Sequence, residues 1–251
     1  MFGKRKRVVV WLSRNSVLKL AMSALLVALT LFMFTYELPA TKTWTYWTMP
    51  LSGKMIALDA GHGGPDGGAS SREGIAEKDI NLAIAKHLRD YLQQAGALVT
   101  MTREEDKDLA APETKGYSRR KTEDLLNRAE LIAKQNPDMY VSIHLNSIPS
   151  ARWRGAQTFY YPNHQDSPNL AALIQEEIKK SLKNTDRVAM QVDKEVYLLK
   201  TLKMPGALVE VGFLSNPEEA RLLSDPAYQK KVAAAIYQGI LRYYAGERAS
   251  L

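Results

Sequence analysis

From Met55 onward, the sequence alternates between short apolar runs and longer segments whose apolar residues recur every three to four positions. The short runs predict buried strands and the longer segments predict amphipathic helices. Strands separated by helices of this length are typical of an α/β fold, in which a mostly parallel central sheet has helices on both faces. The predicted strands span residues 56–59, 97–102, 139–144, 156–161, 195–199 and 207–211, and the predicted helices span 79–94, 122–135, 167–182 and 225–243.

One long segment of this region fits neither pattern. Residues 104–121 are rich in charge and contain Pro112 and Gly116. Long loops without their own secondary structure are uncommon inside compact domains and are often functional. We therefore expect residues 104–121 to form a loop over the rim of the domain's functional site.

The amino-terminal part of the chain predicts a membrane segment. Residues 20–36 hold no charge and are mostly apolar, and as a helix they would reach about 25 Å. Basic residues precede them, so residues 1–19 are predicted to be a cytoplasmic tail and the rest of the chain to be exported. A cleaved signal peptide is the alternative, and it also predicts export. Residues 37–54 are interpreted as a linker to a folded domain that spans 55–246.

The net charge of +7 belongs mostly to this amino-terminal part. The remainder is nearly neutral, so the basic excess indicates membrane topology, and we expect no nucleic-acid partner. The chain contains no cysteine, which excludes disulfides and thiolate metal ligands. Six positive charges precede the first acidic residue, Glu37: Lys4, Arg5, Lys6, Arg7, Arg14 and Lys19.

Four polar residues are predicted to meet at one edge of the sheet. His62 follows the first strand, His144 ends the third, Glu210 lies near the end of the last, and Glu77 begins the helix after His62. The carboxyl ends of strands form the ligand-binding edge of open α/β sheets. Two imidazoles and one carboxylate are a common catalytic zinc set, and a second carboxylate can take a proton from water.

Each of these residues also has an ordinary interpretation. A histidine at a strand end is more often packed or solvated than bound to a metal. Glu77 alone would be an acid favoured by the helix dipole. Glu210 stands out, because a carboxylate within an apolar strand is costly to bury without a partner.

Four motifs follow one another along the chain: GHGG at 61–64, EKDINL at 77–82, SIHLN at 142–146 and VEVGFLSN at 209–216. Together they resemble the zinc-dependent N-acetylmuramoyl-L-alanine amidases of bacterial cell walls, from about Met55 to Tyr243. The resemblance implies that His62, Glu77 and His144 bind Zn²⁺ and that Glu210 is the catalytic acid and base. It also implies that the substrate is peptidoglycan, cleaved at the amide between N-acetylmuramic acid and L-alanine.

Further expectations follow from this resemblance. Arg103 and Asn146 are candidate donors to the oxyanion or substrate. The short anchor, the lack of an added wall-binding repeat and the loop around residues 115–121 resemble the amidases of sporulation and germination. Those enzymes act in forming muramic δ-lactam in the spore cortex, between the forespore and mother-cell membranes. Relatives are often controlled by partners, so an activator protein is also expected, with residues 104–121 as its place of action.

Two alternatives remain open at this point. The same site could belong to a zinc peptidase that cuts within the stem peptide of peptidoglycan. A non-catalytic wall-binding module is the other alternative, although such a module would be expected to have lost at least one of the four site residues.

Overall fold

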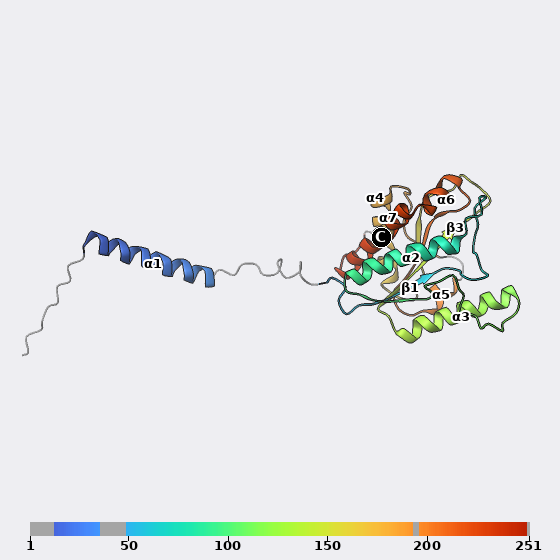
Figure 1. Ribbon diagram of the computed structural model, residues 1–251, viewed down its shortest axis with the longest axis horizontal. Coiled ribbons are helices and arrows are strands. Elements are labelled where there is room, and N and C mark those ends of the chain that lie inside the picture. The colour runs from blue at the N-terminus through green and yellow to red at the C-terminus, as the bar shows by residue number, and fades with distance from the viewer. Residues whose placement is uncertain (1–12, 36–48, 193–195, 250–251) are drawn as a thin grey trace, which may run out of the picture. The chain divides into compact units, whose positions relative to one another are not determined.

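The computed structural model describes residues 13–35, 49–192 and 196–249 (Figure 1). Most of the predicted cytoplasmic tail and residues 37–48 of the predicted linker lie outside the described residues. The chain divides into two units, Met1–Thr48 and Met49–Leu251.

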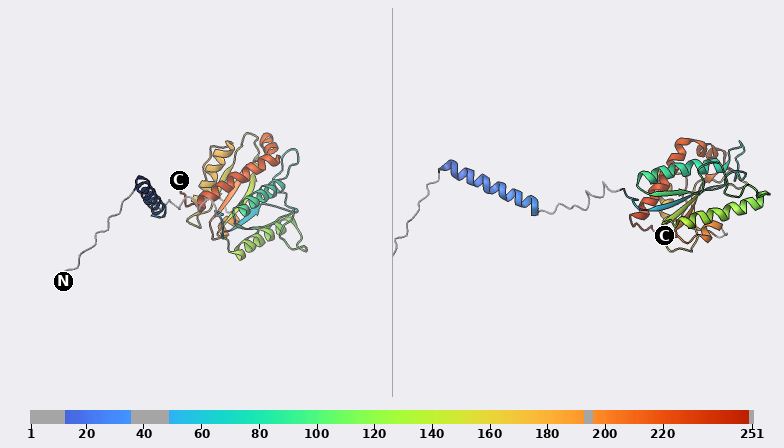
Figure 2. Two further views of the ribbon diagram at one scale, coloured as in Figure 1. Left: turned by 60° about the vertical axis from the view of Figure 1, so that its left-hand side comes forward. Right: turned by 60° about the horizontal axis from the view of Figure 1, so that its bottom comes forward.

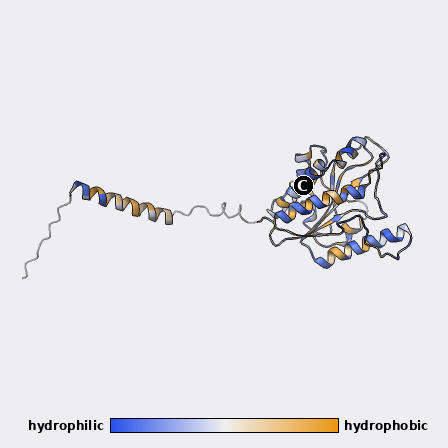
Figure 3. Cartoon of the chain, viewed as in Figure 1, coloured by the Kyte–Doolittle hydropathy of each residue, from blue (hydrophilic) through white to orange (hydrophobic). Residues whose placement is uncertain are grey.

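The first unit contains helix α1 (Arg14–Thr35), which matches the predicted membrane segment. Its stretch Arg14–Met33 has a mean hydropathy of 2.1, and none of that stretch is buried. Figure 3 shows the helix as mostly hydrophobic beyond its basic first turns. An apolar helix with exposed side chains is not a core helix of a soluble domain, because such a helix would bury them. Among the described residues, α1 is the one helix fit to span a membrane, as an anchor or a signal segment.

The second unit is built on a six-stranded, mostly parallel sheet of order β2-β1-β3-β6-β4-β5. Strands β2, β1, β3 and β6 are mutually parallel, and β4 is antiparallel to β6. The α/β expectation is therefore confirmed. The strands are β1 (Met55–Ala60), β2 (Leu98–Met101), β3 (Met139–Asn146), β4 (Gln157–Tyr160), β5 (Met190–Gln191) and β6 (Gly206–Phe213).

Helices cover both faces of this sheet, as Figures 1 and 2 show. Helices α2 (Glu77–Gln94), α4 (Ser167–Leu182) and α7 (Pro226–Tyr244) pack over the main apolar core on one face. Helices α3 (Tyr117–Gln135) and α5 (Tyr197–Thr201) pack over a smaller core on the other. The short helix α6 (Pro217–Ser224) packs against α7 and β6.

The sheet face beneath α3 and α5 changes from apolar to polar along its strands. Tyr140 and Leu208 belong to the smaller core. Alternate residues of a strand point to the same face, so His144 and Glu210 continue that face at the carboxyl end. These two residues are direct partners in the register of β3 and β6. The fold thus places His144 and Glu210, two of the predicted site residues, side by side at the sheet edge.

The predicted strand at 195–199 is wrong, because residues 197–201 form helix α5. Leu198, Leu199 and Leu202 are all buried in the smaller core. Their spacing is helical rather than alternating, and this decides the local structure. Helix α3 begins at Tyr117, within the predicted loop, while β5 and α6 were not predicted.

Candidate active site

The turn after β1 brings His62 to the edge of the sheet. A Cβ atom on Gly61 would lie 2.2 Å from Cε1 of His144, so only glycine fits between the two rings. His62 has a φ of 64°, in the left-handed region that a residue with a side chain rarely adopts. Such a conformation persists only where surrounding contacts hold it.

Two buried arginines supply those contacts. Arg128 donates to the carbonyl oxygens of Ala60 and His62, at 2.8 and 2.6 Å. Arg103 donates to the carbonyl oxygens of Ala60 and Gly61, at 2.9 and 3.1 Å. Every carbonyl from Ala60 to His62 therefore accepts a charged hydrogen bond, which holds the turn in its unusual conformation.

Two carboxylates balance the charge of Arg128. Asp59 of β1 lies 2.8 Å from Nη1 of Arg128, and Asp124 of α3 lies 2.9 Å from its Nε. Asp59 also accepts hydrogen bonds from Thr102 and Ser142. Burial by itself would raise the pKa of Asp59, but the charges of Arg128 and His144 and the hydrogen bonds from Ser142 and Arg128 lower it to about 2. The pair is thus ionised at neutral pH and is fully buried.

Glu77 is the first residue of α2, so it reaches the site from the sheet face opposite to α3. Its Oε2 accepts from the amide of Ala69, and its Oε1 accepts from the amide of Leu145 and from Asn81. A carboxylate is also favoured at a helix amino terminus. The side chain is 4 % exposed and is fixed by these donors.

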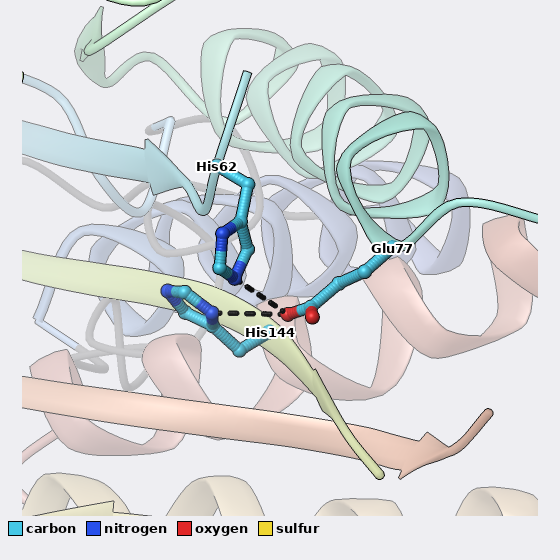
Figure 4. A group of neighbouring side chains, drawn as sticks. All are labelled: His62, Glu77 and His144. Carbon is cyan, nitrogen blue, oxygen red and sulfur yellow. Dashed lines mark hydrogen bonds and ion pairs between the residues drawn. The ribbon is translucent and has the colours of Figure 1, made fainter. Parts of the chain in front are cut away.

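His62, Glu77 and His144 converge as predicted (Figure 4). Oε1 of Glu77 lies 3.2 Å from Nε2 of His62 and 3.1 Å from Nδ1 of His144. The two rings meet edge to face, with centroids 5.0 Å apart. One donor atom from each residue lies within 4.8 Å of the others, so a single metal ion could be shared by all three. Two imidazoles and one carboxylate suit zinc, and they leave a position for water or substrate.

The electrostatics of the cluster favour positive charge. Burial lowers the pKa of His62, but hydrogen bonds to Asp66 and Glu77 outweigh it and raise the pKa to about 9. Burial raises the pKa of Glu77, but the two histidines hold that pKa well below its usual range. Carboxylates that stabilise an imidazolium would equally stabilise a metal cation at the same place.

Glu210 lies beside this cluster but outside its donor set. Its Oε2 is buried and has no hydrogen-bond partner among the described residues. Burial raises the pKa of Glu210 to about 7; the charge of Glu77 adds to this effect and the nearby imidazoles oppose it. An acid or base with a pKa near the working pH can both take and return a proton.

The two candidate oxyanion donors have different surroundings. Arg103 is 2 % exposed, and it donates to the carbonyls of Lys78 and Glu105 as well as to the His62 turn. Its contacts therefore favour a role in holding the backbone rather than in meeting substrate. Asn146 ends β3 just beyond His144, after a register shift, and it is partly exposed at the rim. Its predicted role stays a prediction.

Several residues of the site were not predicted. Asp66 accepts from His62, and Asp59, Asp124 and Arg128 form the buried network. Arg128 had a detectable signal, because it lies on the apolar stripe of α3 between Leu125 and Ile132.

A pocket of about 160 Å³ opens beside His62 and His144, between α3 and α5. Its walls include Leu125, Leu198 and Leu199.

The fold and the site together define an α/β protein with a candidate metal centre at the edge of its sheet. The family model of N-acetylmuramoyl-L-alanine amidases matches residues 56–242, and the chain belongs to that family. It is an enzyme that cleaves the bond between N-acetylmuramic acid and L-alanine in peptidoglycan, as expected from the sequence. The peptidase and binding-module alternatives have no such support.

Individual relatives agree with this assignment. The chain is 54 % identical over 214 residues to the germination-specific N-acetylmuramoyl-L-alanine amidase of Bacillus subtilis, covering 85 % of this chain and 90 % of the relative. It is 28 % identical to the amidase AmiA of Escherichia coli, over 76 % of each chain. The CwlD amidase from Clostridioides difficile, solved in complex with the GerS lipoprotein, superposes with a TM-score of 0.75 at 46 % identity. That match covers 77 % of this chain and all of the solved one.

The close approach at Gly61 gives a test of the metal site. We expect Gly61→Ala to displace the His144 ring and to weaken Zn²⁺ binding by roughly tenfold or more, as for loss of a supporting contact. Gly67→Ala is the matched control, since a Cβ there meets nothing within 4 Å. Equilibrium dialysis of both variants measures the effect, and equal affinities would show that His144 does not bind the metal.

The buried Asp59 gives a test of the scaffold. Asp59→Asn leaves part of the Arg128 charge unbalanced and should lower the free energy of unfolding at pH 7 by about 3 kcal/mol. Asp90→Asn, which breaks an exposed pair with Arg89, should cost less than about 1 kcal/mol. Urea denaturation measures both.

The same residue predicts a pH dependence. The pKa of Asp59 is lowered from 3.8 to about 2, so its stabilising effect is complete above pH 4 and is lost as the pH falls towards 2. The unfolding free energy of Asp59→Asn should fall less steeply than that of the wild type over this range. Parallel curves would contradict the assignment.

Proposed function

We propose that this amidase uses zinc held by His62, Glu77 and His144, with Glu210 as the catalytic acid and base. The observation that supports it most is the convergence of three donor atoms within 4.8 Å beside a buried carboxylate oxygen that lacks a partner. When bound, zinc lowers the pKa of a coordinated water and polarises the substrate carbonyl.

The chain's own residues move the proton. Glu210, with its pKa raised to about 7, takes a proton from the attacking water as the oxygen bonds to the lactyl carbonyl carbon. When the carbon–nitrogen bond breaks, Glu210 returns that proton to the leaving amine of L-alanine. The products are a free lactyl carboxyl group on the glycan and a released stem peptide.

The surrounding residues orient the reaction. Asn146, at the rim just beyond His144, is proposed as a donor to the developing oxyanion. Arg103 is proposed to act indirectly, because its guanidinium group is bound to the carbonyls that set the His62 turn. The pocket between α3 and α5 opens beside His62 and His144, with Leu125, Leu198 and Leu199 among its walls.

The biological setting is proposed from the relatives. Identity of 54 % to a germination-specific amidase supports removal of stem peptides in the spore cortex, which is the step that permits muramic δ-lactam to form. Helix α1 would carry residues 55–246, the proposed catalytic domain, outside the cytoplasm as a membrane anchor or an export signal. In a sporulating cell that space lies between the forespore and mother-cell membranes.

A protein partner is also proposed. The C. difficile relative was solved in complex with a lipoprotein, GerS. An activator of this chain would be expected to contact the segment 104–121, which reaches the His62 turn through Asp106. Asp106 accepts from the amide of Gly64 and from Lys78, while Asp108 pairs with Arg120.

The role of Glu210 can be tested directly. Glu210→Gln keeps the shape of the side chain but cannot accept the proton, so activity should fall by about 10²- to 10⁴-fold. Zinc content should stay at the wild-type level, whereas His62→Ala should lose zinc and activity together. Mass spectrometry of muropeptides identifies the cleaved bond. Shortened peptides still attached to muramic acid would instead identify a peptidase, and near-normal activity would exclude Glu210 as the base.

The cortex assignment has a separate test. Cells that produce only the Glu210→Gln chain should form spores whose cortex lacks muramic δ-lactam, with full stem peptides in its place. Muropeptide analysis of purified spores measures this, and wild-type spores are the control. Normal δ-lactam content would show that another substrate or another enzyme is involved.

A further inference from the structure

Asp66 contacts His62 on the side away from the metal donors. Nδ1 of His62 lies 2.8 Å from Oδ2 of Asp66, while Nε2 of the same ring faces Glu77 at 3.2 Å. A carboxylate at one ring nitrogen keeps the proton there and leaves the lone pair of the other nitrogen for a metal. We propose that Asp66 is a positioning residue for His62 and that the first turn of α3 holds Asp66 in place.

The contacts of Asp66 come from two directions. Within its own turn, Oδ1 accepts from the amide of Gly68 at 3.1 Å, and the backbone of Asp66 pairs with that of Gly63. From α3, the hydroxyl of Tyr117 donates to Oδ1 at 2.8 Å, and Nζ of Lys121 lies 3.0 Å from Oδ2. The carboxylate is thus held at both oxygens.

The two α3 residues form a clamp on this carboxylate. Tyr117 and Lys121 are four residues apart, so they project from the same face of the helix, one turn apart. Tyr117 is 58 % exposed and the Lys121 side chain is 40 % exposed, whereas the Asp66 side chain is only 10 % exposed. Exposed groups of this kind contribute little to folding stability. Their convergence on one buried carboxylate is therefore better explained by orientation of His62 than by stabilisation of the fold.

The same helix also holds the backbone of His62. Arg128, farther along α3, donates to the His62 carbonyl at 2.6 Å. Helix α3 consequently fixes the main chain of His62 through one side chain and its ring through Asp66. The metal affinity of the site should then depend on the first turn of α3, which does not touch the metal donors.

The experiment measures Zn²⁺ affinity of the metal-stripped full chain in detergent by competition with a chromophoric chelator. Absorption of the Co²⁺ form provides a second readout of ligand geometry. Asp66→Asn should weaken Zn²⁺ binding by about 10- to 100-fold. Tyr117→Phe and Lys121→Met should each weaken it by a smaller factor and shift the Co²⁺ spectrum, with the melting temperature of the metal-free protein unchanged. Lys134→Met, an exposed charge in the last turn of α3, is the matched control.

The outcomes separate this inference from the proposed function on which it rests. If the wild type binds no zinc, or His62→Ala binds it equally well, the proposed metal site fails. If the wild type binds zinc and Asp66→Asn binds it within twofold, only the positioning role is overturned. Should Asp66→Asn fail to fold, the two α3 variants decide, because both keep the carboxylate. If Tyr117→Phe and Lys121→Met both kept the wild-type Zn²⁺ affinity and Co²⁺ spectrum, the clamp would be excluded.

Discussion

The buried guanidinium of Arg128 joins three parts of the molecule at one point. It pairs with Asp59 at the end of β1, with Asp124 on its own helix and with two carbonyls of the His62 turn. A buried cation needs this compensation, because an unpaired charge in the interior is strongly unfavourable. These pairs hold α3 against β1, and Arg128 and Arg103 together hold the left-handed backbone at His62. The geometry of the metal donors therefore depends on an ion pair that does not touch them.

The sheet contributes a second constraint. One face of β3 and β6 runs from Tyr140 and Leu208, in the smaller core, to His144 and Glu210 at the rim. The apolar part packs against α3 and α5, and His144 lines the pocket between these helices. Strands β3 and β6 thus contribute core residues along part of their length and site residues at their carboxyl ends. This arrangement buries the carboxyl group of Glu210, which raises its pKa, while it stays next to charged groups.

The four principal site residues could be predicted because each lies where a strand ends or a helix begins, and parallel strands bring such places to one edge. Asp66 could not, since an aspartate among glycines is equally typical of an ordinary turn. Its role depends on α3, whose first turn lies within a segment predicted to be a loop. The helix at 197–201 was missed for a related reason: a short apolar run fits strand or helix equally well until its packing partners are known. The burial of Arg103 and its four carbonyl acceptors could not be predicted, because they depend on the tertiary structure.

Glu77 accepts hydrogen bonds from two backbone amides and from Asn81, quite apart from any ion. Its negative charge is already solvated by the protein, unlike the ligands of small zinc domains that unfold when the metal leaves. The ion and the folded state are consequently separable. A chelator would then stop the reaction without unfolding the domain.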